Sequence, residues 1–182
     1  RYLPEKVRTH VEQTYYARVQ AQARLDAIIN DPEFRAAPET HPALFSDHGV
    51  VHVRDVAHQI LHVLDAINGV LIPARAGDRL ERLKSYGLSA VYLHDIGMID
   101  VSPIGRVMHP EFAAQAVFAP DSDEIIESIW AANCGGLSDH LTDLRRLGAI
   151  TQGPKVVLRE LLSLSMCHSK SKVPVKFLND PA

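Results

Sequence analysis

An apolar segment that ends in a histidine and an aspartate constrains this chain more than any other feature. At about 100° per residue of a helix, its apolar side chains scatter around the whole helical wheel: Leu88, Ala90, Val91, Tyr92, Leu93 and Ile96. A helix that is apolar on all sides is a buried one. His94 and Asp95 are therefore expected in the core, where an ionised carboxylate is costly unless it is paired or bound to a cation. A metal ion is the most economical partner for both groups together.

The composition limits the class of protein. The 182 residues suffice for one domain with a substantial core, and we predict a single domain over 1–182. The net charge of -3 argues against general nucleic-acid or membrane-surface binding. With two cysteines, Cys134 and Cys167, no disulfide framework is expected. Neither a leader peptide nor a long apolar run is found, so we predict a cytoplasmic protein without a membrane span. The chain begins without methionine and ends in a loop-like stretch, so we expect a piece of a longer protein with further domains.

Hydrophobic periodicity predicts helices throughout, and the expected fold class is all-α. The N-terminal part, 1–43, is predicted as a helix from Pro4 to Ile28 followed by a proline-rich loop. Further helices are expected over 50–67, 88–95, 110–118, 121–133 and 154–168. Pro110 is expected to open its helix, and Asp121 with Glu124 to form a helix cap. The charged stretch 75–84 is predicted to be a loop or an exposed helix.

Helical wheels sort the histidines, of which the chain has ten. On the 50–67 helix, His58 and His62 lie opposite the apolar stripe and are expected at the surface. His52 lies at the margin of that stripe and can reach inward. His48 and His52 are four residues apart, like a zinc-binding pair, but the glutamate of a metalloprotease motif is missing because Gly49 follows His48. The stripe itself consists of Val53, Val56, Ile60, Val63, Leu64 and Ile67.

Two later histidines each allow two interpretations. His109 precedes Pro110 and is either a helix cap or a ligand. His168 ends a helix and is either a histidine favoured by the helix dipole or a ligand. We predict that His168 lies on the same helix face as Val157, Leu161 and Leu164. The remaining histidines have no companions and are expected at the surface: His10, His41 and His140.

Neighbours on a helix point in different directions, which is a geometric objection to His94 and Asp95 as a pair. The objection weakens at a helix end, where Gly97 can release the backbone. It also weakens if the aspartate bridges two metals while the histidine serves one.

Two segments resemble the HD-domain superfamily of metal-dependent phosphohydrolases: FSDHGVVHVRDVA at 45–57 and LHDIGMI at 93–99. That family has a histidine early on one helix, a His-Asp pair on the next core helix and an aspartate on a late helix. His52, His94 and Asp95 match the first three positions, and His109 matches a further histidine of binuclear members. The resemblance covers 44–172, which leaves 173–182 as a tail.

The chain also departs from that family pattern. The late aspartate is not evident, and His168 stands as its expected substitute. The lysine that often follows His-Asp-Ile-Gly is Met98 here. The Gly-Tyr-Pro motif and the double histidine of the cyclic-di-nucleotide phosphodiesterases are absent. The end of the segment, CHSKSK at 167–172, resembles more loosely some HD domains fused to larger bacterial multidomain proteins.

The resemblance implies an HD-type helical bundle that holds one or two divalent ions. Histidine and carboxylate ligands without thiolates suit Mn, Fe, Co, Ni or Zn. Such an ion lowers the pKa of a bound water and polarises a phosphoryl oxygen. The expected metal ligands are His52, His94, Asp95, His109 and His168, with Asp95 and His94 as the catalytic pair. The candidate phosphate contacts, for which surface charge is the alternative, are Lys170, Lys172 and Arg106.

The expected function is a divalent-metal-dependent phosphohydrolase acting on a small phosphorylated substrate, a nucleotide or another phosphoester. No general base stands out, since Asp100 is a weak candidate and Glu111 fits a first-turn helix charge better. The alternative is a non-catalytic metal- or nucleotide-sensing HD module that regulates attached domains. A third class, a structural helical interaction domain, would be excluded by bound metal.

Overall fold

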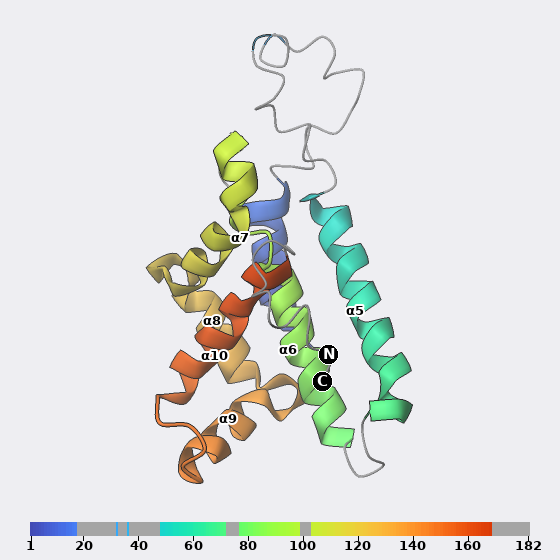
Figure 1. The fold of residues 1–182 in the computed structure, drawn as a ribbon, viewed down its shortest axis with the longest axis vertical. Coiled ribbons are helices and arrows are strands. Elements are labelled where there is room, and N and C mark those ends of the chain that lie inside the picture. Colours follow the sequence, from blue (N-terminus) through green and yellow to red (C-terminus); the bar gives the residue numbers. More distant parts are fainter. Residues whose placement is uncertain (18–31, 33–35, 37–47, 72–76, 99–102, 169–182) are drawn as a thin grey trace, which may run out of the picture.

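The computed structural model describes residues 1–17, 32, 36, 48–71, 77–98 and 103–168 (Figure 1). Within these ranges the chain forms seven α-helices and no strand, which confirms the all-α prediction. The helices are α1 (Glu5–Val11), α5 (Val50–Leu71), α6 (Gly77–Leu93), α7 (Pro103–Phe118), α8 (Asp123–Ala132), α9 (Leu137–Arg146) and α10 (Pro154–Ser163). A π-helix and three 3₁₀ segments accompany them: η1 (Glu12–Tyr16), η4 (Pro120–Ser122), η5 (Cys134–Gly136) and η6 (Leu164–His168). None of the described helices is long and apolar enough to cross a membrane.

Helix α6 is the central element of the fold. It contacts α1, α5, α9 and α10 as well as the short segments η5 and η6. Figure 1 shows α6 between α5 on one side and α8 and α10 on the other. Enclosure from several directions explains why the apolar residues of this segment surround the whole helical wheel. The buried helix predicted over 88–95 is thus the second half of α6, and the charged stretch before it is the more exposed first half.

The N-terminal helix joins the core through a change of helical register. Val11 and Tyr16 are both buried and lie five residues apart. A π-helical turn, with its i to i+5 hydrogen bonds, places such residues on the same side. This explains why Tyr16 enters the core while the neighbouring Tyr15 is only half-buried. The prediction of a helix from Pro4 is confirmed as far as Tyr16, and 18–31 lie outside the described residues.

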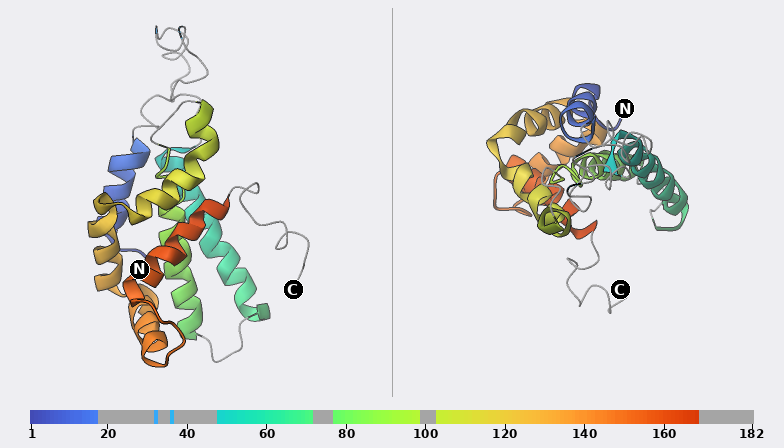
Figure 2. Two further views of the ribbon diagram at one scale, coloured as in Figure 1. Left: turned by 60° about the vertical axis from the view of Figure 1, so that its left-hand side comes forward. Right: turned by 90° about the horizontal axis from the view of Figure 1, so that it is seen from above.

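Pro110 does not open a helix as predicted, because it lies inside α7, which begins at Pro103. A proline inside a helix removes one backbone hydrogen bond and bends the helix. Figure 2 shows that α7 changes direction along its length. Sequence rules favour proline at the start of a helix. Pro110 is tolerated inside α7 because its side chain is buried.

The region between α8 and α10 differs from the prediction in two ways. The cap assigned to Asp121 is wrong, since α8 begins at Asp123 with Ser122 at its N-cap position. Helix α9 was not expected from the sequence. Its first turn is capped by Asn133, whose Oδ1 accepts hydrogen bonds from the backbone N–H of Ser138 (2.9 Å) and of Asp139 (3.2 Å). The apolar spacing that could have revealed α9 is Leu137, Leu141 and Leu144.

The turn after α6 lies directly against the backbone of α7. A Cβ atom added to Gly97 would lie 2.2 Å from the carbonyl oxygen of His109 and 2.3 Å from the amide nitrogen of Ala113. These separations are far below van der Waals contact. A side chain at 97 would therefore push the His94-Asp95 turn away from α7.

We expect Gly97→Ala to lower the free energy of unfolding by at least about 2 kcal/mol, because overpacking against backbone atoms forces the turn and α7 apart. The measurement is chemical denaturation of the purified chain. Gly153→Ala is the matched control, since a Cβ there has its nearest neighbour at 3.8 Å, and it should change stability by less than about 1 kcal/mol. Equal effects of the two substitutions would contradict the close approach at Gly97.

Candidate metal centre

The side chain of Asp95 occupies the middle of a cluster of histidines. Helix α6 ends at Leu93, and residues 94–98 form the following turn. At this helix end the side chains of His94 and Asp95 converge, with 2.9 Å between His94 Nε2 and Asp95 Oδ2. The Asp95 side chain is only 1% exposed. Adjacent side chains diverge within a helix, but His94 and Asp95 lie in the turn after α6, so their side chains can converge.

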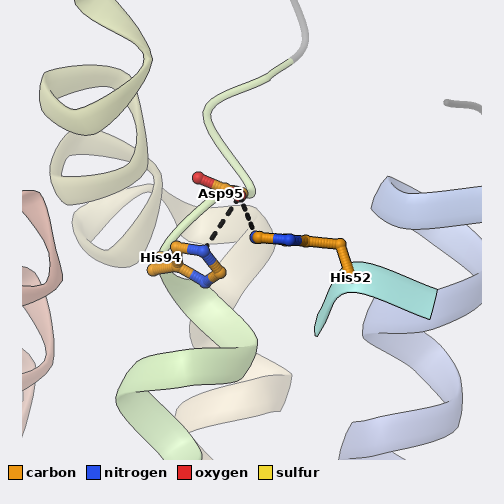
Figure 3. Close-up of side chains that lie close together, drawn as sticks. All are labelled: His52, His94 and Asp95. Carbon is orange, nitrogen blue, oxygen red and sulfur yellow. Dashed lines mark ion pairs between the residues drawn. The ribbon is translucent and has the colours of Figure 1, made fainter. Parts of the chain in front are cut away.

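Both oxygens of the Asp95 carboxylate face imidazole nitrogens. Oδ2 lies near Nε2 of His94 and, at 3.6 Å, near Nε2 of His52 from α5, as Figure 3 shows. Oδ1 lies 3.4 Å from Nε2 of His109 on α7 and 3.5 Å from Nε2 of His168 on η6. One carboxylate is therefore shared by four imidazoles from different elements. We call these five residues the Asp95 cluster.

The spacing of the donor atoms in the Asp95 cluster suits bound metal. Two ligand atoms that share an ion at about 2.1 Å lie about 3.0 Å apart at a right angle and about 3.4 Å apart at the tetrahedral angle. The observed separations fall close to this range. Two groups could each hold an ion, with ligand atoms all within 4.8 Å of one another: His52 with His94 and Asp95, and His109 with His168 and Asp95.

Backbone carbonyls fix the orientation of two of the imidazoles. Nδ1 of His94 lies 2.5 Å from the carbonyl oxygen of Val91, and Nδ1 of His168 lies 2.7 Å from that of Ser165. A carbonyl oxygen only accepts, so in both rings Nδ1 carries the hydrogen and donates it. In the neutral rings, Nε2 then presents a lone pair toward the Asp95 carboxylate. Metal-binding histidines in proteins commonly have this second hydrogen bond to a carbonyl.

A lone pair directed at a carboxylate oxygen is repulsive unless a cation lies between them. Nε2 of His109 and Nε2 of His168 are also only 3.0 Å apart. Either His109 donates a hydrogen to His168 there, or both nitrogens bind one ion. Protons or a metal ion must therefore supply positive charge at the centre of the cluster.

Burial and the neighbouring imidazoles shift the pKa values of this cluster. Burial alone would raise the pKa of the Asp95 carboxyl, but the adjacent His109 and His94 lower it far below its ordinary value. Burial lowers the pKa of His168, against the opposing effect of its hydrogen bond to the Ser165 carbonyl. Asp95 is thus ionised and His168 favours the neutral state, which are the forms that bind metal.

A network from the N-terminal helix supports the turn that carries Asp95. The hydroxyl of buried Tyr16 donates to the carbonyl oxygen of Tyr92 at 3.1 Å, and the Asp95 N–H points to that hydroxyl at 3.4 Å. Tyr92 in turn donates its hydroxyl to Glu12 Oε1 at 3.0 Å. Arg54 of α5 forms a two-pronged contact with the same Glu12, at 3.0 and 2.6 Å. Burial followed by the nearby Asp95 charge raises the pKa of Tyr16, which stays protonated.

The structure brings together His52, His94, Asp95, His109 and His168, as expected from the sequence. The face predicted for His168 is wrong in detail, because Leu164 is 52% exposed and the buried residues of this region are Leu158, Leu162 and Ser165. The last turn is a 3₁₀ segment, which rotates each residue further than an α-helix does, so the expected wheel does not hold up to His168.

His48 lies beside the site, although it was not among the expected metal ligands. Its ring centroid lies 5.3 Å from that of His52 and 6.1 Å from that of His109. Burial lowers its pKa, so it also favours the neutral form. The signal for His48 was its spacing of four residues from His52. It adds a further imidazole at the edge of the Asp95 cluster.

Other candidate residues lie elsewhere. His58, His62, His10 and His140 are exposed as predicted. Glu111 is half-buried on α7. Four candidates fall outside the described residues: His41, Asp100, Lys170 and Lys172. Of Arg106, only the backbone in α7 is described.

We expect Tyr16→Phe to destabilise the chain by about 1–3 kcal/mol, because the buried Tyr92 carbonyl loses its donor and the Asp95 N–H loses its acceptor. The measurement is the free energy of unfolding of the metal-free protein. Tyr15→Phe is the control, since Tyr15 is half-buried and its hydroxyl has no hydrogen-bond partner among the described residues. A Tyr16→Phe protein as stable as the Tyr15→Phe protein would show that the hydroxyl does not support the turn.

We also expect the metal-free protein to lose stability as the pH falls from 7 to 5. The unfolded chain protonates its histidines near pH ~6.5, whereas burial lowers the pKa of His48 and His168 in the folded state. The unfolded state then binds more protons, so the free energy of unfolding decreases through this window. Asp95 adds little here, because its lowered pKa keeps it ionised in the folded state throughout the window.

The measurement is chemical denaturation at each pH in the presence of a chelator. His168→Gln should flatten the pH dependence, and His140→Gln, at an exposed position, should leave it unchanged. A slope that is identical in the two variants would contradict the assignment to the cluster.

The chain matches no family model, no curated protein and no solved structure. What the site binds is therefore inferred from the side chains that form it.

Proposed function

We propose that this chain is an HD-type domain that binds one or two divalent metal ions at the Asp95 cluster and hydrolyses a phosphoester, a nucleotide or a similar small substrate. The observation that carries this proposal is the buried Asp95 carboxylate, both oxygens of which face imidazole Nε2 atoms at 2.9–3.6 Å. The order of these residues along the chain, with His94 and Asp95 adjacent, matches the motif order described above and supports the family assignment.

The residues of the Asp95 cluster form two groups, each of which can accommodate one ion. His52 and His94 would hold one ion with an oxygen of Asp95, and His109 and His168 would hold the other with the same carboxylate. The carbonyls of Val91 and Ser165 hold two of the rings in the binding orientation. A divalent ion at such a site lowers the pKa of a coordinated water and polarises a phosphoryl oxygen. With imidazoles in the majority and a single carboxylate, the set favours Mn, Fe, Co, Ni or Zn over Mg.

Cations next to the cluster in the chain are proposed to contact the phosphate. Arg106 precedes His109 by about one helical turn on α7. Lys170 and Lys172 follow His168 closely in the sequence. Their positive charges complement a phosphoryl group held at the Asp95 cluster.

A non-catalytic metal- or nucleotide-sensing module is the second candidate function, and two observations favour it. Met98 is 7% exposed and packs in the turn after His94-Asp95, where the resembling family often has a lysine. That turn therefore brings no positive charge of its own to a phosphate. The single carboxylate also leaves two divalent ions with little compensating negative charge.

Metal analysis of matched variants tests the proposal. We expect wild-type protein loaded with Mn or Zn and then desalted to retain one or two ions per chain. His52→Ala and His168→Ala should each lose one ion, because each removes a ligand from one position. Asp95→Asn should lose both ions and all hydrolysis of bis(p-nitrophenyl) phosphate and of a nucleotide panel. His58→Ala and His62→Ala, which change exposed histidines on α5, are the controls and should retain metal and activity.

The outcomes separate the candidate functions. Wild-type protein that retains no metal, or an Asp95→Asn protein that retains it fully, would overturn the metal centre and with it the family assignment. Retained metal without hydrolysis of any phosphoester would favour the sensing module. Circular dichroism of each variant distinguishes loss of metal from loss of the fold.

A further inference from the structure

A hollow between α6, α9 and α10 lies apart from the Asp95 cluster and has no role in the proposed chemistry. It encloses about 520 Å³ and is lined along α6 by 79–86, whereas Asp95 follows the other end of that helix. Figure 1 shows α9 beside the lower end of α6 and α10 above α9 on the same side. The volume lies within the range of about 300–1,000 Å³ that small-molecule sites occupy. We propose that this hollow binds a small amphipathic anion, with an apolar body and one carboxylate group.

Apolar side chains from three helices form the floor of the hollow: Leu83, Leu137, Leu141, Leu144 and Leu161. Tyr86 adds its ring, and its hydroxyl is already satisfied by donation to the carbonyl oxygen of Leu161 at 2.8 Å. That hydrogen bond joins α6 to α10 and fixes the ring at the wall. Binding of the apolar part of a ligand to this concave surface is favourable, because it removes apolar surface from water.

Three basic side chains line the same hollow. Arg79 and Arg82 are three residues apart on α6 and therefore project from the same side of the helix, and His140 faces them from α9. Within the described part of the chain, neither arginine forms an ion pair. Several other basic residues do pair with carboxylates: Arg1, Lys6, Arg54, Lys84, Lys155 and Arg159. Arg79 and Arg82 thus have guanidinium donors available for an anionic group.

The surroundings of the hollow restrict the anion to one negative group. A neighbouring groove shares Arg82 and His140 with the hollow, and it is lined by the carboxylates of Asp78, Glu81, Asp139 and Asp143. These carboxylates repel any further negative charge that extends beyond Arg82. A polyphosphate or a nucleic acid is therefore disfavoured. A single carboxylate at the arginines, with its apolar body over the leucines, satisfies both features.

Octanoate and its uncharged counterpart octan-1-ol are the probes for this site. Titration of the metal-free protein, followed by NMR of the leucine methyl groups, should show saturable shifts at Leu83, Leu141 and Leu144. Octanoate should bind at least about tenfold more tightly than octan-1-ol, a ratio worth about 1.4 kcal/mol. The double variant Arg79→Gln/Arg82→Gln should abolish that preference without changing the affinity for octan-1-ol. Leu144→Gln should weaken binding of both probes.

Arg146→Gln on α9 is the control, because Arg146 does not line the hollow and pairs with Asp143. Equal affinity for the two probes, or an unchanged preference in the double arginine variant, would overturn the proposal. The proposal would also be overturned if light scattering showed that the wild-type chain is a dimer and the Leu144→Gln variant a monomer. The hollow would then be an interface between copies of the chain. The double arginine variant changes residues outside the buried core, so it provides a valid test even if Leu144→Gln fails to fold.

Discussion

A buried negative charge is the constraint on which this structure depends. The Asp95 carboxylate is almost wholly removed from water, and its oxygens face imidazole nitrogens from four histidines. Without positive charge at the centre, desolvation of such a group would oppose folding. The carbonyls that hold His94 and His168 in one tautomer direct lone pairs inward, so the cluster could hold a cation. The chemistry proposed for the site follows from this arrangement.

The rest of the fold positions the turn that carries this charge. Gly97 lets the turn lie against the backbone of α7, which brings His109 to one side of Asp95. Tyr16 contacts the turn from η1, and Arg54 joins η1 to α5 through Glu12. Helices that are far apart in the sequence thus meet at one end of α6. A substitution in any of these contacts acts on the geometry of the cluster without touching a ligand.

The sequence predicted the parts of the site that depend on simple helical periodicity. His94 and Asp95 follow from an apolar wheel, and His52 from its place at the margin of a stripe. Details that depend on departures from the α-helix were not predictable in this way. Tyr16 enters the core through a π turn. His168 was expected in the site, but it reaches the cluster on a 3₁₀ turn, so the helix face predicted for it is wrong. Pro110 lies inside a helix because burial and tertiary packing outweigh its preference for a helix start, and α9 begins where the Asn133 side chain caps it.

The order of the Asp95 cluster residues along the chain has a consequence for biosynthesis. His52, His94 and Asp95 all precede α7, whereas His168 is the last residue that the structure describes. Proteins are made from the N-terminus, and early segments can fold before later ones emerge from the ribosome. His52, His94 and Asp95 are therefore all synthesised before α7, whereas the group that contains His109 receives its last member only with His168. A cation held by the first group would offset the negative charge of Asp95 before the later residues cover it.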